Sequence, residues 1–189
     1  SKVSQDRGLI RYLMRHRHTT PFEMVEFKYH CKMPIFVARQ WVRHRTANIN
    51  EYSLRYSEAR DEFYYPDPEN IQFQSALNKQ GRLGEVSDEL KKKVNTYFKE
   101  ISDRSFEIYS ELNNAGVARE LARAILPVNL YTEWYWKNDL HNLLHFIGLR
   151  SDDHAQYEIR VFSDAMAESV KKVAPFAWEA YQDYVVSGL

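Results

Sequence analysis

The sequence predicts an α+β fold, a single domain over residues 1–189 with a small, mainly antiparallel sheet flanked by several helices, including long amphipathic helices. Apolar residues recur at helical spacing in about six segments, and other segments alternate apolar and polar residues as strands do. The predicted strands neither follow one another in a run nor alternate one for one with the helices. A length of 189 residues suits one hydrophobic core.

The first third of the chain is predicted to contain a helix, a strand and a second helix. Apolar residues at helical spacing predict a helix that ends near Arg17. Strict alternation predicts a strand over residues 25–33 with one buried face. Pro34 then opens a helix, because proline fits the first helical turn. Continued helical spacing places three polar side chains on one face of that helix: Gln40, Arg43 and His44.

The middle third is predicted to lead from loops into a long helix. Residues 46–65 predict an irregular loop with a short strand, and the PDPEN run after them predicts a turn. Residues 70–85, which contain two glycines, predict a connecting loop. Ser87 caps a long amphipathic helix that stops at residues 113–116. The residues expected to be buried along this helix are Leu90, Val94, Tyr97, Ile101, Ile108 and Leu112.

The last third is predicted to be mostly helical around one strand. A short helix ends before Pro127, and the β-branched and aromatic residues after it predict a strand over 128–137. Helical spacing then predicts helices over 139–149 and 152–173, and Pro175 separates a last short helix. The apolar stripe expected along the 152–173 helix is Ala155, Ile159, Phe162, Met166, Val170 and Val173.

Composition restricts the compartment and the partners. Lys and Arg together number 26, as do Asp and Glu, so the formal charge is +0 and a broad basic surface for a nucleic acid polymer is not expected. Cys31 is the one cysteine, which predicts a fold without an internal disulfide, a reducing cytoplasmic location and a core position for this residue. No apolar run has membrane length, so no membrane partner is expected.

The tripeptide Arg-His-Arg occurs twice, and only the second copy is followed by hydroxyl, amide, carboxylate and guanidinium side chains. Arg43-His44-Arg45 is followed, after seven residues, by Ser53 and Arg55. Guanidinium groups bind phosphate through paired hydrogen bonds, and hydroxyl, amide and carboxylate groups can bind a sugar or a base. These residues therefore suit a phosphorylated polar ligand. Alternatively, the cations complement a helix dipole and lie in water.

Several segments together resemble one enzyme family. The pattern RHR-x7-S, from Arg43 to Ser53, resembles the signature of the flavin-dependent thymidylate synthases. The run HTTPFE from His18 and the segments PIFVARQWVRHR, ELARAILPVNLYTEWYW and LHNLLHFIGLRSDDHAQYEIR resemble that family in the same order. The resemblance covers nearly the whole chain. We expect the family's usual first strand to lie outside this sequence.

The resemblance implies a reaction and its participants. The family makes thymidylate from deoxyuridylate (dUMP), with methylenetetrahydrofolate as carbon donor, FAD as hydride relay and NADPH as reductant. It implies a homotetramer with active sites at subunit interfaces. It also implies that no covalent enzyme nucleophile is needed, which agrees with the expected core position of Cys31. No Gly-x-Gly-x-x-Gly occurs, so a Rossmann-type cofactor site is not expected.

The resemblance also implies roles for individual residues. By matching positions, the flavin contacts are Thr20, Arg43, His44, Arg45, Glu51, Asp139, Leu140, His141 and His145, with His18 as a further candidate. The nucleotide contacts are Gln40, Trp41, Val42, Arg43, Glu51, Tyr52, Ser53, Leu54, Arg55, Arg123 and Arg150. Arg150 is the catalytic residue: a guanidinium beside the pyrimidine carbonyl and N3 favours the enolate-like ring and makes C5 more nucleophilic.

Other interpretations of these residues remain open from sequence alone. Arg150 can be a cation at a helix C-terminus, and Arg123 a solvated partner of Glu120 or Glu133. His141 and His145 are four residues apart and can form a metal pair, although no metal site is expected because no carboxylate ligand pattern accompanies them. The competing functions are an RNA-binding module that uses both Arg-His-Arg runs, and a helical scaffold or metal protein that also uses His154.

Overall fold

The computed structural model describes residues 2–76 and 81–188, and the chain divides into two compact units. The terminal unit contains the described residues up to Tyr29, residues 44–48 and the residues from Lys137 onward. The central unit contains His30–Arg43 and Ile49–Trp136. Each unit combines helices with strand residues, so the predicted α+β class is confirmed. The single-domain organisation stays a prediction.

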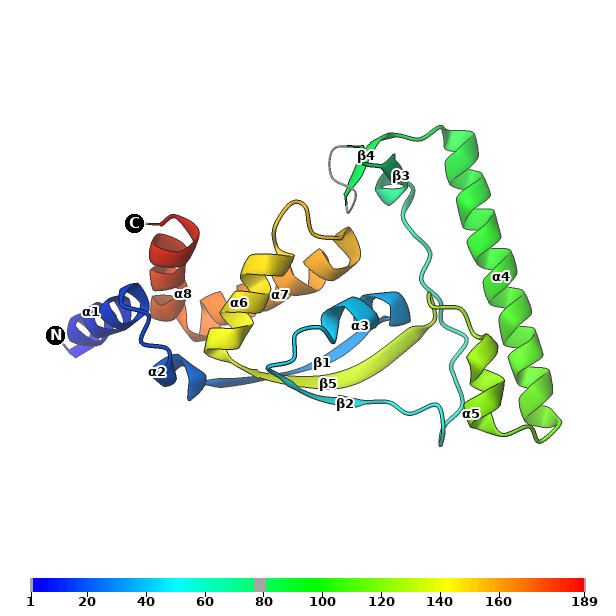
Figure 1. Ribbon diagram of the computed structural model, residues 1–189, viewed down its shortest axis with the longest axis horizontal. Coiled ribbons are helices and arrows are strands. Elements are labelled where there is room, and N and C mark those ends of the chain that lie inside the picture. Colours follow the sequence, from blue (N-terminus) through cyan, green and yellow to red (C-terminus); the bar gives the residue numbers. More distant parts are fainter. Residues whose placement is uncertain (1, 77–80, 189) are drawn as a thin grey trace. The chain divides into compact units, whose positions relative to one another are not determined.

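The terminal unit is mainly helical. Its helices are α1 (Lys2–Arg15), α2 (Thr20–Glu23), α6 (Leu140–Arg150), α7 (Tyr157–Val173) and α8 (Pro175–Tyr181), which continues as a π-helical turn (Gln182–Val186). Figure 1 shows α6 beside α7 and α1 beside α8. The core of this unit lies between α6 and α7, where Phe146 and Ile159 are fully buried. The α1 helix has no buried residue, and the ion pair between Arg7 and Glu179 is one of its contacts with α8.

The central unit contains most of a three-stranded sheet with the order β1-β5-β2. These strands are β1 (Glu26–Pro34), β5 (Tyr131–Asp139) and β2 (Asn48–Glu51). Figure 1 shows α3 (Ile35–Trp41) lying over this sheet. The buried Trp41 ring of α3 packs edge-on against Trp134 and Trp136 of β5, with 5.4 Å between centroids in each pair. Large aromatic area buried in this way anchors the helix that precedes the Arg-His-Arg run.

The rest of the central unit contains the long helix and a hydrophobic cluster packed against part of it. Its elements are a 3₁₀ turn (Pro68–Asn70), β3 (Gln72–Gln74), β4 (Arg82–Glu85), α4 (Asp88–Asn114), α5 (Arg119–Ala122) and a second 3₁₀ turn (Arg123–Ile125). Tyr109 of α4 is buried here, and its hydroxyl accepts a hydrogen bond of 2.8 Å from the Ala59 amide. Leu54 packs against the same cluster. This contact fixes one end of the loop that carries the predicted nucleotide residues.

Most predicted elements are confirmed, including Ser87 as the cap of α4, where its side chain accepts from the Leu90 amide. Two boundaries were wrong. The α3 helix ends at Trp41, so Arg43 and His44 do not continue its face, because the chain leaves there to enter β2. The α7 helix begins at Tyr157, because Asp152 bonds the amide of His154 and forms a turn.

Residues 70–85 hold an antiparallel pair, β3 with β4, where a loop was predicted. Both strands are short and exposed, so they lack the alternation that would have indicated them. Residues 77–80 of the predicted loop lie outside the described residues.

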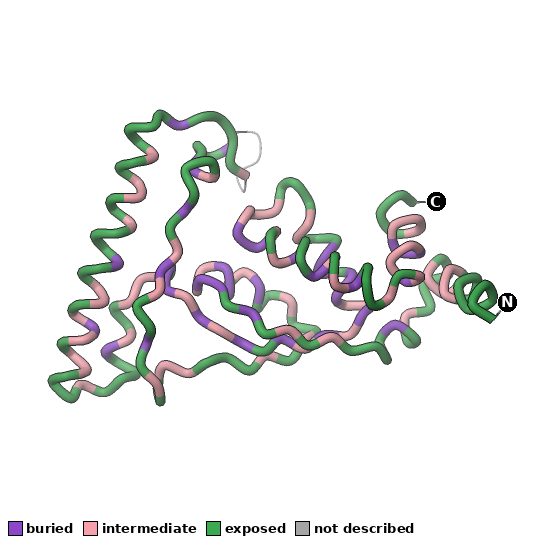
Figure 2. The backbone as a smooth tube through the Cα atoms, turned by 180° about the vertical axis from the view of Figure 1, so that it is seen from behind, coloured by how far each residue is buried: buried purple, intermediate pink, exposed green. Residues whose placement is uncertain are grey.

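The predicted apolar stripe of α4 is only partly buried. Of the six residues expected to be buried, Leu90 is 39% exposed, Tyr97 53% and Ile101 61%, and the other three are intermediate; Tyr109, which is buried, was not among them. Figure 2 shows most of α4 exposed or intermediate, in contrast to the buried segments of β5. An amphipathic pattern predicts an apolar face but does not say which surface covers it. Among the described residues, no helix has both the length and the apolar character needed to cross a membrane.

Candidate active site

The start of α6 presents two histidines one helical turn apart. Asp139 caps this helix: its carboxylate accepts hydrogen bonds from the Asn142 amide at 2.9 Å and from the Asn142 side chain at 2.8 Å. Leu140 is buried, and its amide donates to the Val25 carbonyl. His141 and His145 line a cavity of the terminal unit. The cap thus fixes the start of a helix that carries two of the histidines lining that cavity.

Arg150 is hydrogen bonded to His44, although the two residues are 106 positions apart. The Arg150 Nε–H donates to His44 Nε2 at 2.9 Å. His44 also packs edge-on against Phe146, with 4.8 Å between centroids, and lies 6.5 Å from His145. Burial, then the nearby Arg150 charge and His145, lower the pKa of His44 from 6.5 to about 4. Near neutral pH His44 is therefore an uncharged acceptor that holds the Arg150 guanidinium at one nitrogen.

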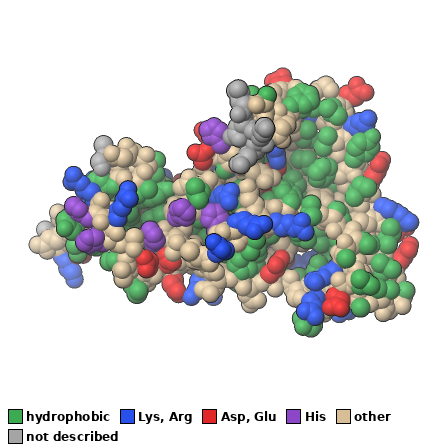
Figure 3. All heavy atoms as spheres, viewed as in Figure 1, with side chains coloured by type: hydrophobic (Ala, Val, Ile, Leu, Met, Phe, Trp, Pro, Cys, Tyr) green, Lys and Arg blue, Asp and Glu red, His purple; other side chains and the backbone are tan. Residues whose placement is uncertain are grey.

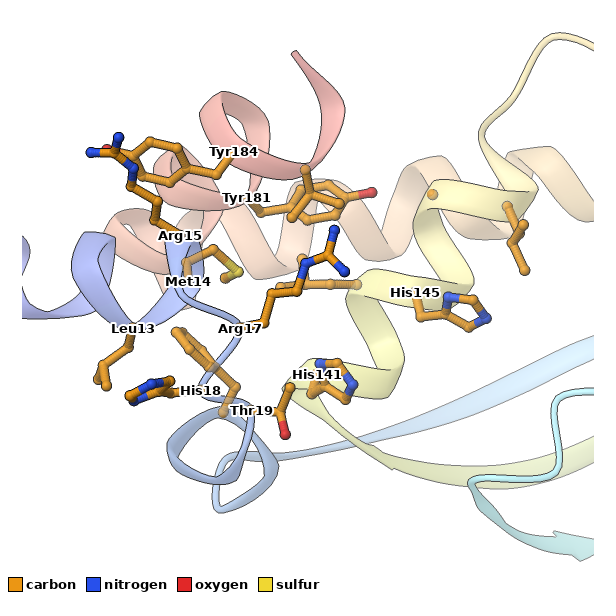
Figure 4. Close-up of a pocket in the computed structure, with 15 residues that line it drawn as sticks. Leu13, Met14, Arg15, Arg17, His18, Thr19, His141, His145, Tyr181 and Tyr184 are labelled. Atoms are coloured by element: carbon orange, nitrogen blue, oxygen red, sulfur yellow. The ribbon is translucent and has the colours of Figure 1, made fainter. Parts of the chain in front are cut away.

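The cavity beside α6 has a volume of about 400 Å³ and lies wholly within the terminal unit. Figure 4 shows its walls, which come from the end of α1, the segment before α2, α6 and the C-terminal helix. His18, Thr19, His141 and His145 contribute polar groups. Figure 3 shows arginine and histidine side chains gathered on this part of the surface, over α1, α2 and α6. The predicted flavin residue Thr20 follows directly as the exposed first residue of α2.

In the central unit, Glu51 is held by a neighbouring strand. The Thr132 hydroxyl of β5 donates to Glu51 Oε1 at 2.7 Å, and Thr132 is nearly buried. The chain then leaves β2 with the Tyr52 amide bonded to the Glu133 carbonyl. One carboxylate oxygen of Glu51 is thus fixed, and the other has no partner among the described residues. This leaves an acceptor available for a ligand donor.

The loop after β2 brings Ser53 and Arg55 to the α5 segment. Arg55 lies 3.5 Å from Glu120 of α5, and Arg119 bonds both the Tyr56 carbonyl and the Glu58 carboxylate. Glu120 therefore pairs with Arg55, and Glu133 with Arg60 and His30. Neither carboxylate binds the half-buried Arg123, which follows α5 directly and forms no ion pair within the described residues. The loop and the α5 segment thus carry the Ser53 hydroxyl and the guanidinium groups of Arg55 and Arg123, beside the engaged Arg119.

The end of α3 supplies the other predicted nucleotide residues. Gln40 has a buried Oε1 with no hydrogen-bond partner in the described part of the chain, which marks a polar group open to a ligand. Val42 and Arg43 are exposed, as is Arg45 beyond them. Trp41 is fully buried, so only its main chain remains for a ligand contact.

Two buried polar residues of β5 were missed by sequence reasoning. Thr132 positions Glu51, and Asn138 is 3% exposed with neither side-chain polar atom hydrogen bonded among the described residues. Both lie on the buried face of β5, in the same alternation as Trp134 and Trp136. A polar residue within an otherwise apolar strand face was a signal available in the sequence.

Cys31 belongs to the buried core and not to the polar groups of this site. Cys31 is buried, as predicted, and burial raises the pKa of its thiol to about 12, so it is not a thiolate at neutral pH. Within the described residues, no group of three His, Cys, Asp or Glu side chains is arranged to hold a metal ion. The expected absence of a metal stays a prediction.

Comparison with known proteins identifies the family. The model of the family described as thymidylate synthase complementing protein matches residues 1–176. A protein of Ehrlichia ruminantium (strain Gardel) named flavin-dependent thymidylate synthase is 57% identical over 182 residues. The chain belongs to the flavin-dependent thymidylate synthases. The resemblance inferred from the Arg-His-Arg signature is thereby confirmed.

Another member of the flavin-dependent thymidylate synthases and a solved structure support this family assignment. The enzyme of Rickettsia conorii (strain ATCC VR-613 / Malish 7) is 53% identical over 200 residues, which cover 99% of this chain and 68% of that protein. The Ehrlichia match covers 96% of this chain and 61% of the relative, so the chain spans about two thirds of these relatives. The crystal structure of the UMP/dUMP methylase PolB from Streptomyces cacaoi bound with 5-Br UMP has a TM-score of 0.90. PolB is 34% identical to this chain, and the match covers 96% of this chain and 83% of the PolB chain.

The donor set of the terminal unit fits the flavin for which the flavin-dependent thymidylate synthases are named. A flavin carries carbonyl and ring-nitrogen acceptors on an apolar ring system, and dinucleotide forms add phosphates. The cavity offers apolar walls, while His141 and His145 supply ring nitrogens that can donate. Arg45 is an exposed cation without an ion pair in the described residues and suits a phosphate. The residues present thus suit both the ring system and the phosphates of such a cofactor.

Proposed function

We propose that this protein catalyses the reductive methylation of dUMP to thymidylate without a covalent enzyme nucleophile. Methylenetetrahydrofolate is the carbon donor, FAD the hydride relay and NADPH the reductant. The observation that carries the proposal is the Arg150 guanidinium held at its Nε by an uncharged His44. The buried Cys31, the one cysteine of the chain, gives independent support because its thiol is protonated.

Arg150 is the catalytic residue in this proposal. The hydrogen bond to His44 occupies Nε, and the terminal nitrogens have no partner among the described residues. These nitrogens can donate to the carbonyl oxygen and N3 of the uracil ring, where negative charge develops when C5 attacks a carbon electrophile. Because His44 fixes the rotation of the guanidinium, the donors are oriented before the ring is activated. The proton lost from C5 passes to solvent.

FAD is proposed to bind through donors that are free of ion pairs. When bound, the flavin supplies hydride equivalents that reduce the transferred carbon to a methyl group. Arg43 and Arg45 are proposed to neutralise the pyrophosphate, and His141 and His145 to donate to the ring. The full set proposed to contact FAD is Thr20, Arg43, His44, Arg45, Glu51, Asp139, Leu140, His141 and His145, with His18 as a further candidate.

The nucleotide is proposed to bind the loop after β2 and the segment after α5. Ser53, Arg55 and Arg123 suit a dianionic monophosphate, since charge-assisted hydrogen bonds to guanidinium are each worth about 1.5–3 kcal/mol. The exposed pair between Arg55 and Glu120 is weak enough to be exchanged for a phosphate. Gln40 offers an amide to the base. The remaining proposed contacts are Trp41, Val42, Arg43, Glu51, Tyr52, Leu54 and Arg150.

We propose a homotetramer with active sites at subunit interfaces, working in the cytoplasm. The exposed apolar residues Tyr97 and Ile101 of α4 support an association that covers them. Light scattering of the purified protein tests this. A particle of about four chain masses is expected, whereas a fully active particle of one chain mass, 22.5 kDa, would contradict it.

A second candidate reaction is methylation of UMP. The solved relative PolB is a UMP/dUMP methylase, which favours some acceptance of the ribonucleotide. The identities of 53% and 57% to flavin-dependent thymidylate synthases favour the deoxyribonucleotide. Flavin-loaded protein should be incubated with methylenetetrahydrofolate, NADPH and either dUMP or UMP, and the products separated by chromatography. Thymidylate from dUMP is expected at the higher rate. A product from UMP alone, or from neither, would refute the proposal.

A further inference from the structure

A guanidinium extends into the cavity of the terminal unit and has no partner in the described part of the chain. Figure 4 shows the Arg17 side chain reaching into the middle of the cavity, whereas Arg15 lies beside Tyr184 at its edge. Arg17 forms no ion pair and no side-chain hydrogen bond within the described residues. The described lining of the cavity contains neither Asp nor Glu. The positive charge of Arg17 is therefore open to a bound molecule.

The backbone after α1 fixes the position of Arg17. The Arg17 amide donates to the Met14 carbonyl at 3.1 Å, and the His18 amide donates to the Leu13 carbonyl at 2.9 Å. This pair of bonds is the Schellman motif, whose C′ position takes a left-handed conformation and is usually glycine. Arg17 occupies it with φ 56° and is the one non-glycine residue with positive φ in the described chain. An arginine held in a conformation that favours glycine points to a use for its side chain.

The carboxylates of the C-terminal segment are already engaged. Asp183 pairs with Arg11 at 2.6 Å, and Glu179 pairs with Arg7. Around the cavity itself, the titratable side chains other than Arg17 are guanidinium, imidazole and phenol groups, namely Arg15, His18, His141, His145, Tyr181 and Tyr184. Arginine keeps its charge at every working pH, whereas a neutral imidazole or phenol offers only a hydrogen bond. The described lining thus presents positive charge without a carboxylate to cancel it.

Reduction changes the charge of a flavin ring, and such a lining responds to that change. A hydride carries two electrons and one proton, so its transfer from NADPH to the neutral oxidised ring gives NADP⁺ and a reduced ring with one negative charge. That charge is shared by N1 and the C2 carbonyl. A cation beside this edge stabilises the reduced ring more than the oxidised ring, because only the reduced ring is an anion. Charge near N1 is a means by which proteins set the reduction potential of a flavin.

We propose that Arg17 binds the N1 and C2 carbonyl edge of the flavin ring and raises the reduction potential of bound FAD. The inference rests on the proposed function, which places the ring at His141 and His145 of the same cavity and makes FAD the hydride relay. Arg17 adds a fixed charge from the segment after α1 to the neutral donors of α6. The volume of about 400 Å³ falls within the range of roughly 300–1,000 Å³ typical of small-molecule sites.

The test is the midpoint potential of FAD bound to the protein. FAD-loaded protein is reduced stepwise with dithionite beside a reference dye of known potential, over a range of pH, and the affinity for oxidised FAD is measured by fluorescence. Arg17→Gly removes the guanidinium and relieves the left-handed backbone, because glycine adopts it without strain. Arg17→Gln keeps most of the side chain without its charge, and Arg17→Lys keeps a charge. Lys172→Gln, at an exposed position of α7 outside the cavity, is the matched loss of one positive charge.

Both uncharged variants, Arg17→Gly and Arg17→Gln, should lower the midpoint potential by about 30 mV, which corresponds to a tenfold loss of preference for the reduced form. Arg17→Lys and Lys172→Gln should stay close to the wild type. The pH below which reduced FAD takes a proton at N1 should rise by about one unit in Arg17→Gly, because the anion has lost its cation. The affinity for oxidised FAD should change less. A residue that only supports the fold would not move this pH.

Equal midpoint potentials in the wild type, Arg17→Gly and Arg17→Gln would overturn the inference, as would an equal fall in Lys172→Gln. If the potential depends on Arg17 but the wild type makes no thymidylate from dUMP, the inference stands and the proposed reaction is refuted. If thymidylate is formed and the potential does not depend on Arg17, the reaction stands and the inference is refuted. A wild type that binds no FAD would overturn both.

Discussion

His44 gives the sharpest quantitative prediction, because its pKa is lowered from 6.5 to about 4 in the folded protein. Between these two pH values the unfolded chain binds a proton that the folded protein excludes, so the free energy of unfolding falls as pH falls through this window. The shift corresponds to roughly 3 kcal/mol at about 1.4 kcal/mol per pH unit. Because the ring is only partly buried, solvent screening reduces the expected contribution to about 1–2 kcal/mol. Below about pH 4 the loss is complete.

The assay is urea unfolding of the wild type and His44→Gln at pH 7 and pH 4.5, at one protein concentration. Glutamine offers an acceptor near the position of the imidazole Nε2 but does not titrate. The fall in the free energy of unfolding between the two pH values should be about 1–2 kcal/mol smaller in His44→Gln. His16→Gln, at an exposed histidine, measures what the loss of an imidazole does by itself. An equal pH dependence in wild type and His44→Gln would refute the reasoning.

Three further predictions concern packing, positioning and nucleotide affinity. A Cβ at Gly148 would lie 2.7 Å from the hydroxyl of the buried Tyr181, so Gly148→Ala should lower the free energy of unfolding by about 1–3 kcal/mol, measured by urea unfolding. Thr132→Val removes the hydrogen bond to Glu51, a proposed dUMP contact. It should weaken dUMP binding about tenfold, measured by titration. Arg123→Ala should raise the dUMP dissociation constant about tenfold or more with less effect on the single-turnover rate.

Each of these has a control that could contradict it. Adding Tyr181→Phe to Gly148→Ala removes the clashing hydroxyl and should recover most of the stability; no recovery would show that the cost lies elsewhere. Thr132→Ser keeps the hydroxyl and should bind ligand like the wild type, so an equal loss would deny the positioning role. Arg39→Ala, at an exposed position of α3, should leave dUMP affinity unchanged.

The sequence predicted elements whose signals are local. Alternation along β1 and β5, the Ser87 cap and the prolines at the start of α3 and α8 each depend on neighbouring residues, and each is confirmed. The β3–β4 pair was missed because strands of three and four exposed residues carry no periodic signal. The exposed stripe of α4 was predicted as buried because periodicity describes one helix and not its surroundings.

The candidate site was predictable as a set of residues but not as an arrangement. The Arg-His-Arg run and Arg150 were selected from motifs, yet the hydrogen bond between His44 and Arg150 joins residues 106 positions apart. No local pattern predicts such a contact. The same holds for Thr132 and Glu51, which meet because β5 and β2 are neighbours in the sheet. Arg17 was noted as part of a repeated tripeptide, and only the structure shows that it lines the cavity with a left-handed backbone.

The central claim is that a guanidinium, and not a thiol, activates the pyrimidine. Its most direct test is the single-turnover rate of thymidylate formation from dUMP by flavin-loaded Arg150→Ala and Cys31→Ala. Arg150→Ala is expected to be slower by about 100-fold, with a smaller change in dUMP affinity, while Cys31→Ala should retain the wild-type rate. An inactive Cys31→Ala that still folds and holds flavin, beside an Arg150→Ala of normal rate, would contradict the claim.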